Sequence, residues 1–226
     1  MTHFPLLTEG YRQSVLPLVH DFFRYPVDYL DQSWVSDNSL LEQVNRLMEK
    51  NGYREPLSDW ILSHFQLTRK VDCDFSEPYS RLALLHTPSL YRLLELAGVL
   101  VYSARVPHDM DDIGMDKELY QFAISKAPFL SRKAPEYCMS KLINDWSNQK
   151  LVRSALLCGG LNLMAIALTD VPESVTGRIA LKLPKDLGIR WQTALGKRNK
   201  PDERIEDARR LVLKLYREVD PLCSLL

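Results

Sequence analysis

The stretch HTPSLYRLLELAGVLVYSARVP, residues 86–107, decides the fold class of this chain. Thr87 suits the start of a helix, and Pro88 suits the first turn because the amide that proline lacks has no partner there. Beyond them, apolar residues cover almost the whole helical circumference apart from a narrow polar strip. A helix of this kind is buried among other helices. We therefore predict a central helix of about four to five turns that ends at Pro107.

A second stretch, LVRSALLCGGLNLMAIAL at 151–168, has the same all-round apolar pattern. Arg153 and Asn162 interrupt it, and it falls short of the roughly 20 residues that span a bilayer. Gly159 and Gly160 permit close contact with another backbone, at some cost in helix stability. We predict a second buried helix here rather than a membrane span.

Amphipathic patterns predict shorter helices around this pair. The clearest local signal is SDNSLLEQVNRLMEKNG, residues 36–52, because Ser39 and Glu42 have capping-box spacing and Gly52 suits the stop. The other predicted helices are 8–23 with an interruption at Pro17, 58–66, 117–126, one that starts at Pro135, and 201–219.

The last predicted helix carries an apolar seam with heptad spacing, made of Ile205, Ala208, Val212, Leu215, Val219 and Leu222. We expect this seam to close the core. Residues 201–226 would then form a C-terminal helix packed on a helical body of residues 1–200, within one domain. A sharper interpretation is that the basic face of this helix also contacts another protein.

The segment GRIALKLP, residues 177–184, changes the period of the pattern from helical to two. Its apolar residues alternate with others, namely Ile179, Leu181 and Leu183 with Arg178, Ala180 and Lys182. This alternation is typical of a half-buried strand, and RKVDCDF at 69–75 is the candidate partner strand. The sequence therefore predicts a mainly α fold, a single globular helical domain with a small β element near 178–183.

Composition excludes several classes of function. The chain has 226 residues, with 29 Lys and Arg against 29 Asp and Glu. This balance argues against a dedicated nucleic-acid binder and against attachment to anionic lipid by charge alone. The four cysteines are widely separated, which fits neither a zinc site nor a disulfide framework and indicates a reducing cytosol. With no secretory signal visible near the N-terminus, we expect a soluble intracellular protein without direct membrane insertion.

Residues that suggest catalysis are few. The stretch HDMDD, residues 108–112, offers donors for a hard metal ion, but neighbours in a loop rarely converge on one centre. Asp72 and Asp74 would raise the pKa of Cys73, which disfavours a nucleophilic thiol. No glycine-rich phosphate loop is present. We predict a protein that is not an enzyme and holds neither cofactor nor metal. The alternative is a small helical metal-dependent hydrolase built on His108 and the aspartates that follow it.

The aromatic stretch FRYPVDYLDQSWV, residues 23–35, follows the first predicted helix. Pro26 disfavours helix at Tyr25. We interpret the stretch as a clasp that fastens the N-terminal helix to the core, with Tyr29 and Trp34 filling the gap between helices. Aromatic residues are also frequent at interface hot spots, so contact with a partner stays open.

The sequence YPVDYLDQSWV, residues 25–35, resembles the N-terminal signature of the SctK family of type III secretion proteins, also called YscK, OrgA or MxiK. The positions that match are Pro26, Tyr29 and Leu30. Arg24 and Asp31 depart from the signature, because an aromatic and a histidine are usual there. Later segments resemble the family in the right order: 87–106 its central helix, 151–184 its later apolar run, and 220–226 its end. Residues 105–150 match no feature of the family.

The resemblance implies a non-enzymatic adaptor in the cytoplasm, peripheral at the inner-membrane face of the secretion apparatus. Members of the family link the cytoplasmic domain of the ring protein SctD to the SctQ pods of the sorting platform. Those pods connect onward to SctL and the SctN ATPase. A secretion chaperone or another regulatory binding module, unrelated to the platform, is a further alternative.

Candidate partner-binding residues come from the aromatic stretch, the acidic connection and the basic face of the last helix. They are Tyr29, Trp34, Asp109, Asp111, Asp112, Arg210, Lys214 and Arg217. Complementary charge would set the choice of partner more than the affinity.

Overall fold

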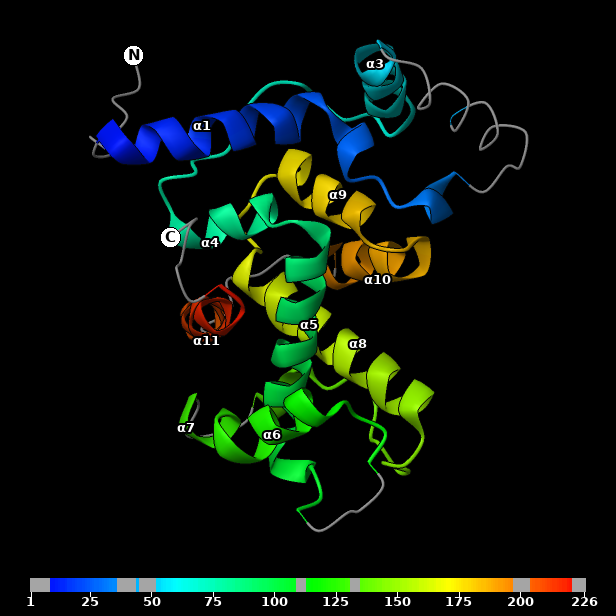
Figure 1. Cartoon of the computed structure of the whole chain (residues 1–226), viewed down its shortest axis with the longest axis vertical. Helices are drawn as coiled ribbons and strands as arrows, with labels where there is room; N and C mark the ends of the chain where they lie inside the picture. The colour runs from blue at the N-terminus through cyan, green and yellow to red at the C-terminus, as the bar shows by residue number, and fades with distance from the viewer. Residues whose placement is uncertain are drawn as a thin grey trace. The chain divides into compact units, whose positions relative to one another are not determined.

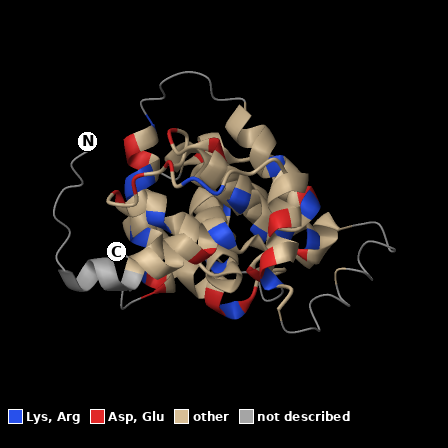
Figure 2. Ribbon diagram, turned by 90° about the horizontal axis from the view of Figure 1, so that it is seen from above, with Lys and Arg blue, Asp and Glu red and all other residues tan. Residues whose placement is uncertain are grey.

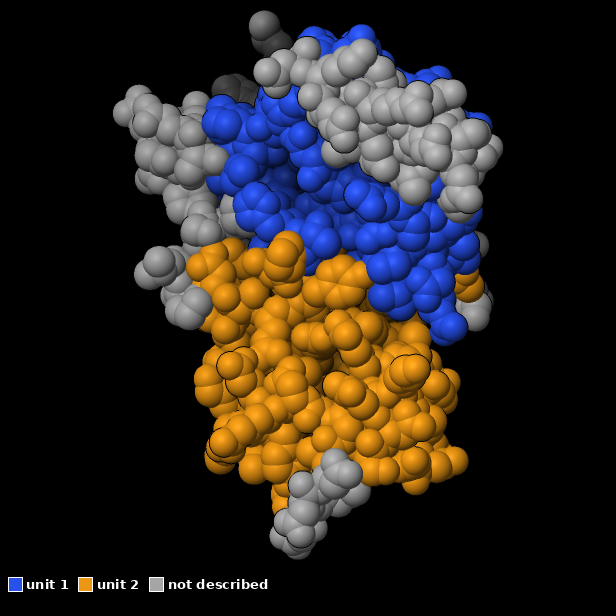
Figure 3. All heavy atoms as spheres, turned by 45° about the vertical axis from the view of Figure 1, so that its right-hand side comes forward, with its two compact units in different colours: residues 1–87, 170–192, 225–226 blue, residues 88–169, 193–224 orange. Residues whose placement is uncertain are grey.

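In the computed structural model, the protein is described over residues 9–35, 44, 52–108, 113–130, 135–196 and 204–220. All regular elements in these ranges are α-helices or 3-10 helices (Figure 1). They form two compact units, coloured separately in Figure 3. Among the described residues, the first unit consists of 9–87 and 170–192, and the second of 88–169 and 193–220.

The first unit is formed by two segments that are far apart in the sequence, 9–87 and 170–192. Its elements are α1 (Glu9–Arg24), η1 (Pro26–Asp28), η2 (Gln32–Trp34), α3 (Arg54–His64), α4 (Pro78–Arg81), η3 (Leu82–Leu84), α9 (Glu173–Lys182) and the start of α10 (Lys185–Gly196). Pro17 lies inside α1, so it does not end that helix. The helix predicted at 58–66 is present as α3 but begins earlier, at Arg54.

The predicted β element near 178–183 is wrong, because these residues lie in the helix α9 and its C-terminal boundary. No strand occurs in the described part of the chain, and 69–75 contain none. The alternation misled because Arg178 and Lys182 are only 0% and 3% exposed, so the basic residues face the core like the apolar ones. A helix with buried cations four residues apart can therefore have the same alternating sequence pattern as a half-buried strand.

The second unit contains the predicted central helix, which is confirmed as α5 (Thr87–Tyr102), although it ends at Tyr102 rather than at Pro107. Its other elements are η4 (Ser103–Arg105), α6 (Lys117–Ser125), α7 (Ala127–Leu130), η5 (Glu136–Cys138), α8 (Gln149–Ala167) and α11 (Ile205–Val219). Side-chain caps start two of them: Asp116 accepts from the Leu119 amide (2.8 Å) and Asn148 from the Leu151 amide (3.1 Å). The helix predicted from Pro135 is wrong, because only the short turn η5 forms there.

Glycines let α5 and α8 approach each other closely. A methyl group at Gly98 of α5 would overlap the backbone carbonyl of Leu156 in α8. A methyl group at Gly160 of α8 would likewise overlap the carbonyl of Leu94 in α5. The contact between these helices is therefore made by backbone on both sides, and only glycine fits. Of the glycine pair in α8, Gly160 makes the predicted backbone contact, whereas Gly159 lies against the side chains of Tyr102 and Val101. The partner glycine in α5 was not anticipated.

The apolar surface of α8 and the apolar seam of α11 are both buried inside the protein. By length and composition α8 is able to cross a membrane, yet 72% of its most apolar window is buried inside the protein. The seam of α11 packs on α8, with Ala208, Val212 and Leu215 fully buried. Arg209 Nε adds a hydrogen bond of 3.1 Å to the carbonyl of Ala167. Leu222 of the predicted seam lies outside the described residues.

The capping-box helix predicted within 36–52 lies almost wholly outside the described residues. Val44 and Gly52 are the exceptions, and Val44 joins a buried cluster with Val35, Leu57, Ile61 and Leu181. Gly52 has a φ of +104°, the left-handed conformation that suits glycine at a helix end.

Candidate functional site

The aromatic stretch 23–35 and Phe22 before it form what we call the N-terminal clasp, residues 22–35. Phe22 and Phe23 are buried, and Tyr29 and Trp34 are half-buried. Tyr29 donates its hydroxyl hydrogen to the carbonyl of Phe22 (2.8 Å) and stacks on that ring. Burial raises the pKa of Tyr29. The indole nitrogen of Trp34 donates to the carbonyl of Leu183 (2.8 Å), and its ring meets the edge of Phe65. The interpretation of this stretch as a structural clasp is confirmed, whereas partner contact through Tyr29 or Trp34 stays a prediction.

Backbone contacts fix the clasp further against α9 and α10. The amide of Asp31 donates to the carbonyl of Leu181 (2.8 Å), and the amide of Lys185 donates to the hydroxyl of Ser33 (2.8 Å). A methyl group at Gly188 would overlap the ring of Trp34, so that ring lies directly on the backbone of α10. The clasp therefore packs against the C-terminal end of α9 and the start of α10.

Arg178 of α9 is the first of two buried cations beneath the clasp. Its guanidinium donates to the carbonyls of Phe23 (3.1 Å), Thr68 (2.6 Å) and Ser174 (2.6 Å). It also lies 4.5 Å from the centre of the Phe23 ring. Carbonyls near the end of a helix lack partners within it, and Arg178 supplies partners to one near the end of α1 and one that follows α3. Burial lowers the pKa of Arg178.

Lys182, one turn further along α9, is the second buried cation. Its Nζ donates to the carbonyls of Ala83 (2.7 Å) and Leu85 (2.6 Å) at the end of η3. The rings of Phe22 and Tyr29 lie 4.9 and 5.2 Å away. Among the described residues no carboxylate forms an ion pair with it. Burial alone lowers the pKa of Lys182 to about 7.

These two cations were not recognised as important from the sequence, because the period-two pattern assigned them to the solvent face of a strand. A usable signal was present. Arg178 and Lys182 are four residues apart, and the segment lies between Pro172 and Pro184. Pro172 in fact precedes the first residue of the helix. Two cations at helical spacing in an otherwise apolar segment favour a buried polar face.

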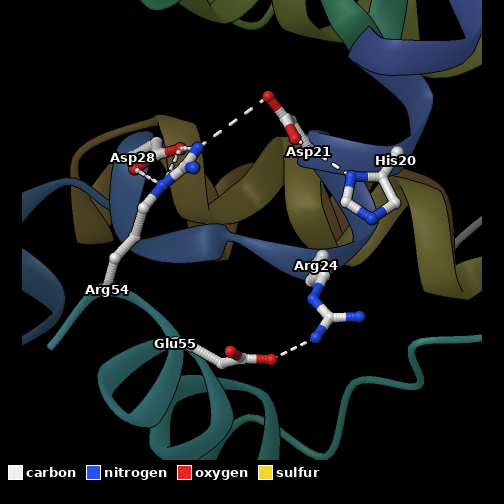
Figure 4. A network of polar contacts seen from close by, with 6 residues as sticks. All are labelled: His20, Asp21, Arg24, Asp28, Arg54 and Glu55. Atoms are coloured by element: carbon white, nitrogen blue, oxygen red, sulfur yellow. Dashed lines mark hydrogen bonds and ion pairs between the residues drawn. The ribbon is translucent and has the colours of Figure 1, made fainter. Parts of the chain in front are cut away.

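An exposed network of charges joins α1 and η1 to α3 (Figure 4). Arg54 Nε lies 3.1 Å from both carboxylate oxygens of Asp28, and the same side chain lies 3.8 Å from Asp21. Arg24 forms an ion pair with Glu55. Adjacent residues of opposite charge on α3 therefore pair with opposite charges in and after α1, which fixes how these segments align.

The basic face of α11 is present as predicted, although its side chains differ in freedom. Arg210 is exposed and bonds Asp207 of its own helix (2.8 Å), and Arg217 is exposed. Lys214 is half-buried and donates to the carbonyl of Leu130 in α7 (3.1 Å). Figure 2 shows the two signs of charge interspersed over the described ribbon. Of the acidic candidates, Asp109, Asp111 and Asp112 lie outside the described residues.

Reactive chemistry has little support in the described ranges. They contain no group of three His, Cys, Asp or Glu side chains that could hold a metal ion. The carbonyl of His108 accepts from the hydroxyl of Tyr120 (2.7 Å), but the aspartates that follow His108 are not described. Cys73 is half-buried, and burial raises the pKa of its thiol.

A pocket of about 230 Å³ lies in the second unit, and its lining residues are Glu95, Gly114, Met115, Asp116, Leu119, Gln149, Arg153 and Leu156. Burial raises the pKa of Glu95, while Arg92 (3.8 Å) and Arg153 (3.7 Å) favour its charged form. Arg92 also contacts Asp116 (3.5 Å). The carboxylate is thus part of an ion-pair network between helices rather than a group aimed at a substrate.

Two comparisons with known proteins bear on this chain. A family model described as "YOP proteins translocation protein K (YscK)" matches residues 18–226. Among solved structures, the chain is similar to one titled "Structure of the cytoplasmic domain of the T3SS sorting platform protein PscK from P. aeruginosa". That match has a TM-score of 0.62 at 19% identity and covers 92% of this chain and 97% of the other. At this identity the likeness concerns the fold.

No curated protein matches the sequence. The family model nevertheless spans almost the whole chain, including the clasp, the buried helices and the last helix. The resemblance to the SctK family, of which YscK is another name, is therefore confirmed. This chain belongs to the YscK family.

Proposed function

We propose that this protein is a non-enzymatic adaptor of a type III secretion sorting platform. It acts in the cytoplasm at the inner-membrane face and links an SctD-like ring protein to SctQ-like pods, and through them to SctL and the SctN ATPase. The observation that carries the proposal is the family match over residues 18–226. The likeness of the fold to the cytoplasmic domain of PscK, named in its title as a sorting platform protein, supports it.

The interior of each unit is consistent with a rigid adaptor that holds its partners at fixed positions. In the first unit, the buried polar groups of Arg178 and Lys182 bond backbone carbonyls and so join segments of the same chain. In the second unit, glycines bring α5 and α8 into backbone contact. Such interiors favour stiffness over chemistry, because the terminal nitrogens of Arg178 and Lys182 already bond carbonyls of the fold.

Deletion of the gene in a secreting bacterium tests the proposal. We expect effector secretion to be lost while the membrane rings still assemble, and the purified full-length chain to bind the SctD-like cytoplasmic domain and the SctQ-like protein. The wild-type gene and a Gly196→Ala variant should both restore secretion, because a methyl group at that position meets no atom within 4 Å. Normal secretion in the deletion strain would contradict the proposal, as would failure of the purified chain to bind either protein.

A further inference from the structure

We propose that one surface of the second unit, formed by α7 and α11, binds an acidic surface of another protein that offers a pocket for an aromatic side chain. We call it the α7–α11 face and define it by Phe129, Arg210, Lys214 and Arg217. This inference rests on the proposed function only for the choice of partner proteins to be tested.

Phe129 is the anchor of this face. Its side chain is 87% exposed, the largest exposed fraction among the described large apolar residues. Pro128 beside it is also exposed, whereas Ala127 is fully buried and holds α7 to the unit. A phenylalanine that projects from the surface gains its full apolar burial only when a second molecule covers it.

The position of Phe129 is fixed from both sides. Before it, Lys126 forms an ion pair with Glu218 of α11. After it, the carbonyl of Leu130 accepts a hydrogen bond of 3.1 Å from Lys214, also on α11. The short helix α7 is therefore tied to α11 at each end, so that binding through Phe129 orders little additional backbone.

The side of α11 that bonds α7 through Lys214 carries three cations. Arg210, Lys214 and Arg217 follow each other at spacings of four and three residues, which places them on one side of the helix. Asp207 offsets part of the charge of Arg210. A row of cations next to an exposed aromatic is complementary to an acidic partner, and aromatic and arginine residues are enriched at binding hot spots. A second copy of the same face would meet like charge.

A membrane or a nucleic acid fits this face less well than a protein does. The apolar seam of α11 is buried on α8, so it is not available to enter lipid. Phe129 and Pro128 alone give too little apolar area for stable attachment to a bilayer. Three cations, of which Lys214 is half-buried, can neutralise few phosphates, so they supply little of the affinity that a nucleic acid needs.

The test uses the full-length protein and three variants, all checked for unchanged helicity and melting temperature. Phe129→Ala removes the anchor, and the double variant Arg210→Glu with Arg217→Glu reverses exposed charges without touching the Lys214 bond. Leu142→Ala is the matched control, because Leu142 is an exposed apolar residue (58%) in the same unit. Dissociation constants are measured against the SctD-like cytoplasmic domain, the SctQ-like protein, anionic phospholipid vesicles and duplex DNA, at low and high salt.

We expect Phe129→Ala to weaken binding to one of the two proteins about tenfold, while Leu142→Ala leaves it unchanged. The charge reversal should weaken the same complex and reduce its dependence on salt. Binding of both proteins by these variants as tightly as by the wild type would overturn the inference alone. Variant-sensitive binding to vesicles or DNA, without an effect on either protein, would also overturn it. If the wild type bound neither protein, the proposed function would fall together with this inference.

Discussion

The interiors of the two units are stabilised by different kinds of contact. In the first unit, two cations of α9 lie in the interior and gather backbone carbonyls from segments far apart in the sequence. In the second, α5 and α8 meet backbone to backbone through Gly98 and Gly160. The first arrangement depends on charge and therefore on pH, whereas the second depends on the absence of two side-chain carbons.

The cost of the two arrangements also differs. A buried cation without a carboxylate loses hydration, and it is tolerated here because several carbonyl oxygens replace the water. A glycine in a helix costs roughly 1 kcal/mol relative to alanine, and the closer packing of two long apolar helices offsets that cost. The units should therefore respond to different perturbations.

The largest expected effect comes from filling the glycine contact. Gly98→Ala gains helix propensity, but its methyl group would overlap the Leu156 carbonyl, and backbone in a packed helix pair has little room to move. We expect the free energy of unfolding, measured by urea denaturation, to fall by about 3 kcal/mol or more. Gly196→Ala is the control and should be close to neutral, since that position is open. A Gly98→Ala variant as stable as the control would contradict the claim that the glycine contact between α5 and α8 stabilises the second unit.

A pH-dependent effect of intermediate size is expected in the first unit. The pKa of Lys182 lies at about 7 in the folded protein against an ordinary value of 10.5. Between these values the unfolded chain holds a proton that the folded chain has released, so the free energy of unfolding rises with pH. The slope from this group is at most about 1.4 kcal/mol per pH unit.

Lys182→Met isolates this titration because it keeps the length of the side chain and removes the charge. Relative to the wild type, the variant should be least impaired near pH 6, where the wild type carries the full penalty of a buried cation. Its relative stability should then decline steadily toward about pH 9. Urea denaturation of both proteins over that range measures the difference, and a difference that does not vary with pH would contradict the burial of Lys182 without a carboxylate.

The smallest effect is expected at the exposed network between α1, η1 and α3. Arg54→Ala removes its contacts with Asp28 and Asp21 and its position 3.8 Å over the Tyr25 ring. Because these groups are solvated, we expect a loss below about 1 kcal/mol that shrinks at high salt. Thermal melts at low and high salt measure it. A loss larger than that of Lys182→Met would mean that surface pairs, rather than buried cations, hold the first unit together.

The sequence predicted the second unit better than the first for a physical reason. The helices α5, α8 and α11 are long and strongly patterned, so local periodicity identifies them. The first unit is held by Arg178 and Lys182, whose burial depends on carbonyls of residues 23, 68, 83 and 85. No local pattern reveals such distant partners. Without a known buried partner, a basic residue is expected at the surface.

The candidate site shows the same limit. The sequence named Tyr29, Trp34 and the basic face of α11 as candidates, but it did not separate structural residues from partner-binding ones. Hydrogen bonds to Phe22 and Leu183 show that the two aromatics anchor the clasp. The exposure of Phe129 was missed, because a single phenylalanine in an apolar segment looks like a core residue until the short helix that carries it is placed.

The central claim is that the two buried cations of α9 hold the N-terminal clasp in place, and amide hydrogen exchange of wild type and Arg178→Met tests it most directly. We predict that the wild-type amides of residues 22–35 exchange slowly, and that in Arg178→Met this segment and α9 lose protection together, more than α5 and α8 do. Fast exchange of residues 22–35 in the wild type, or unchanged protection there in the variant, would contradict the claim.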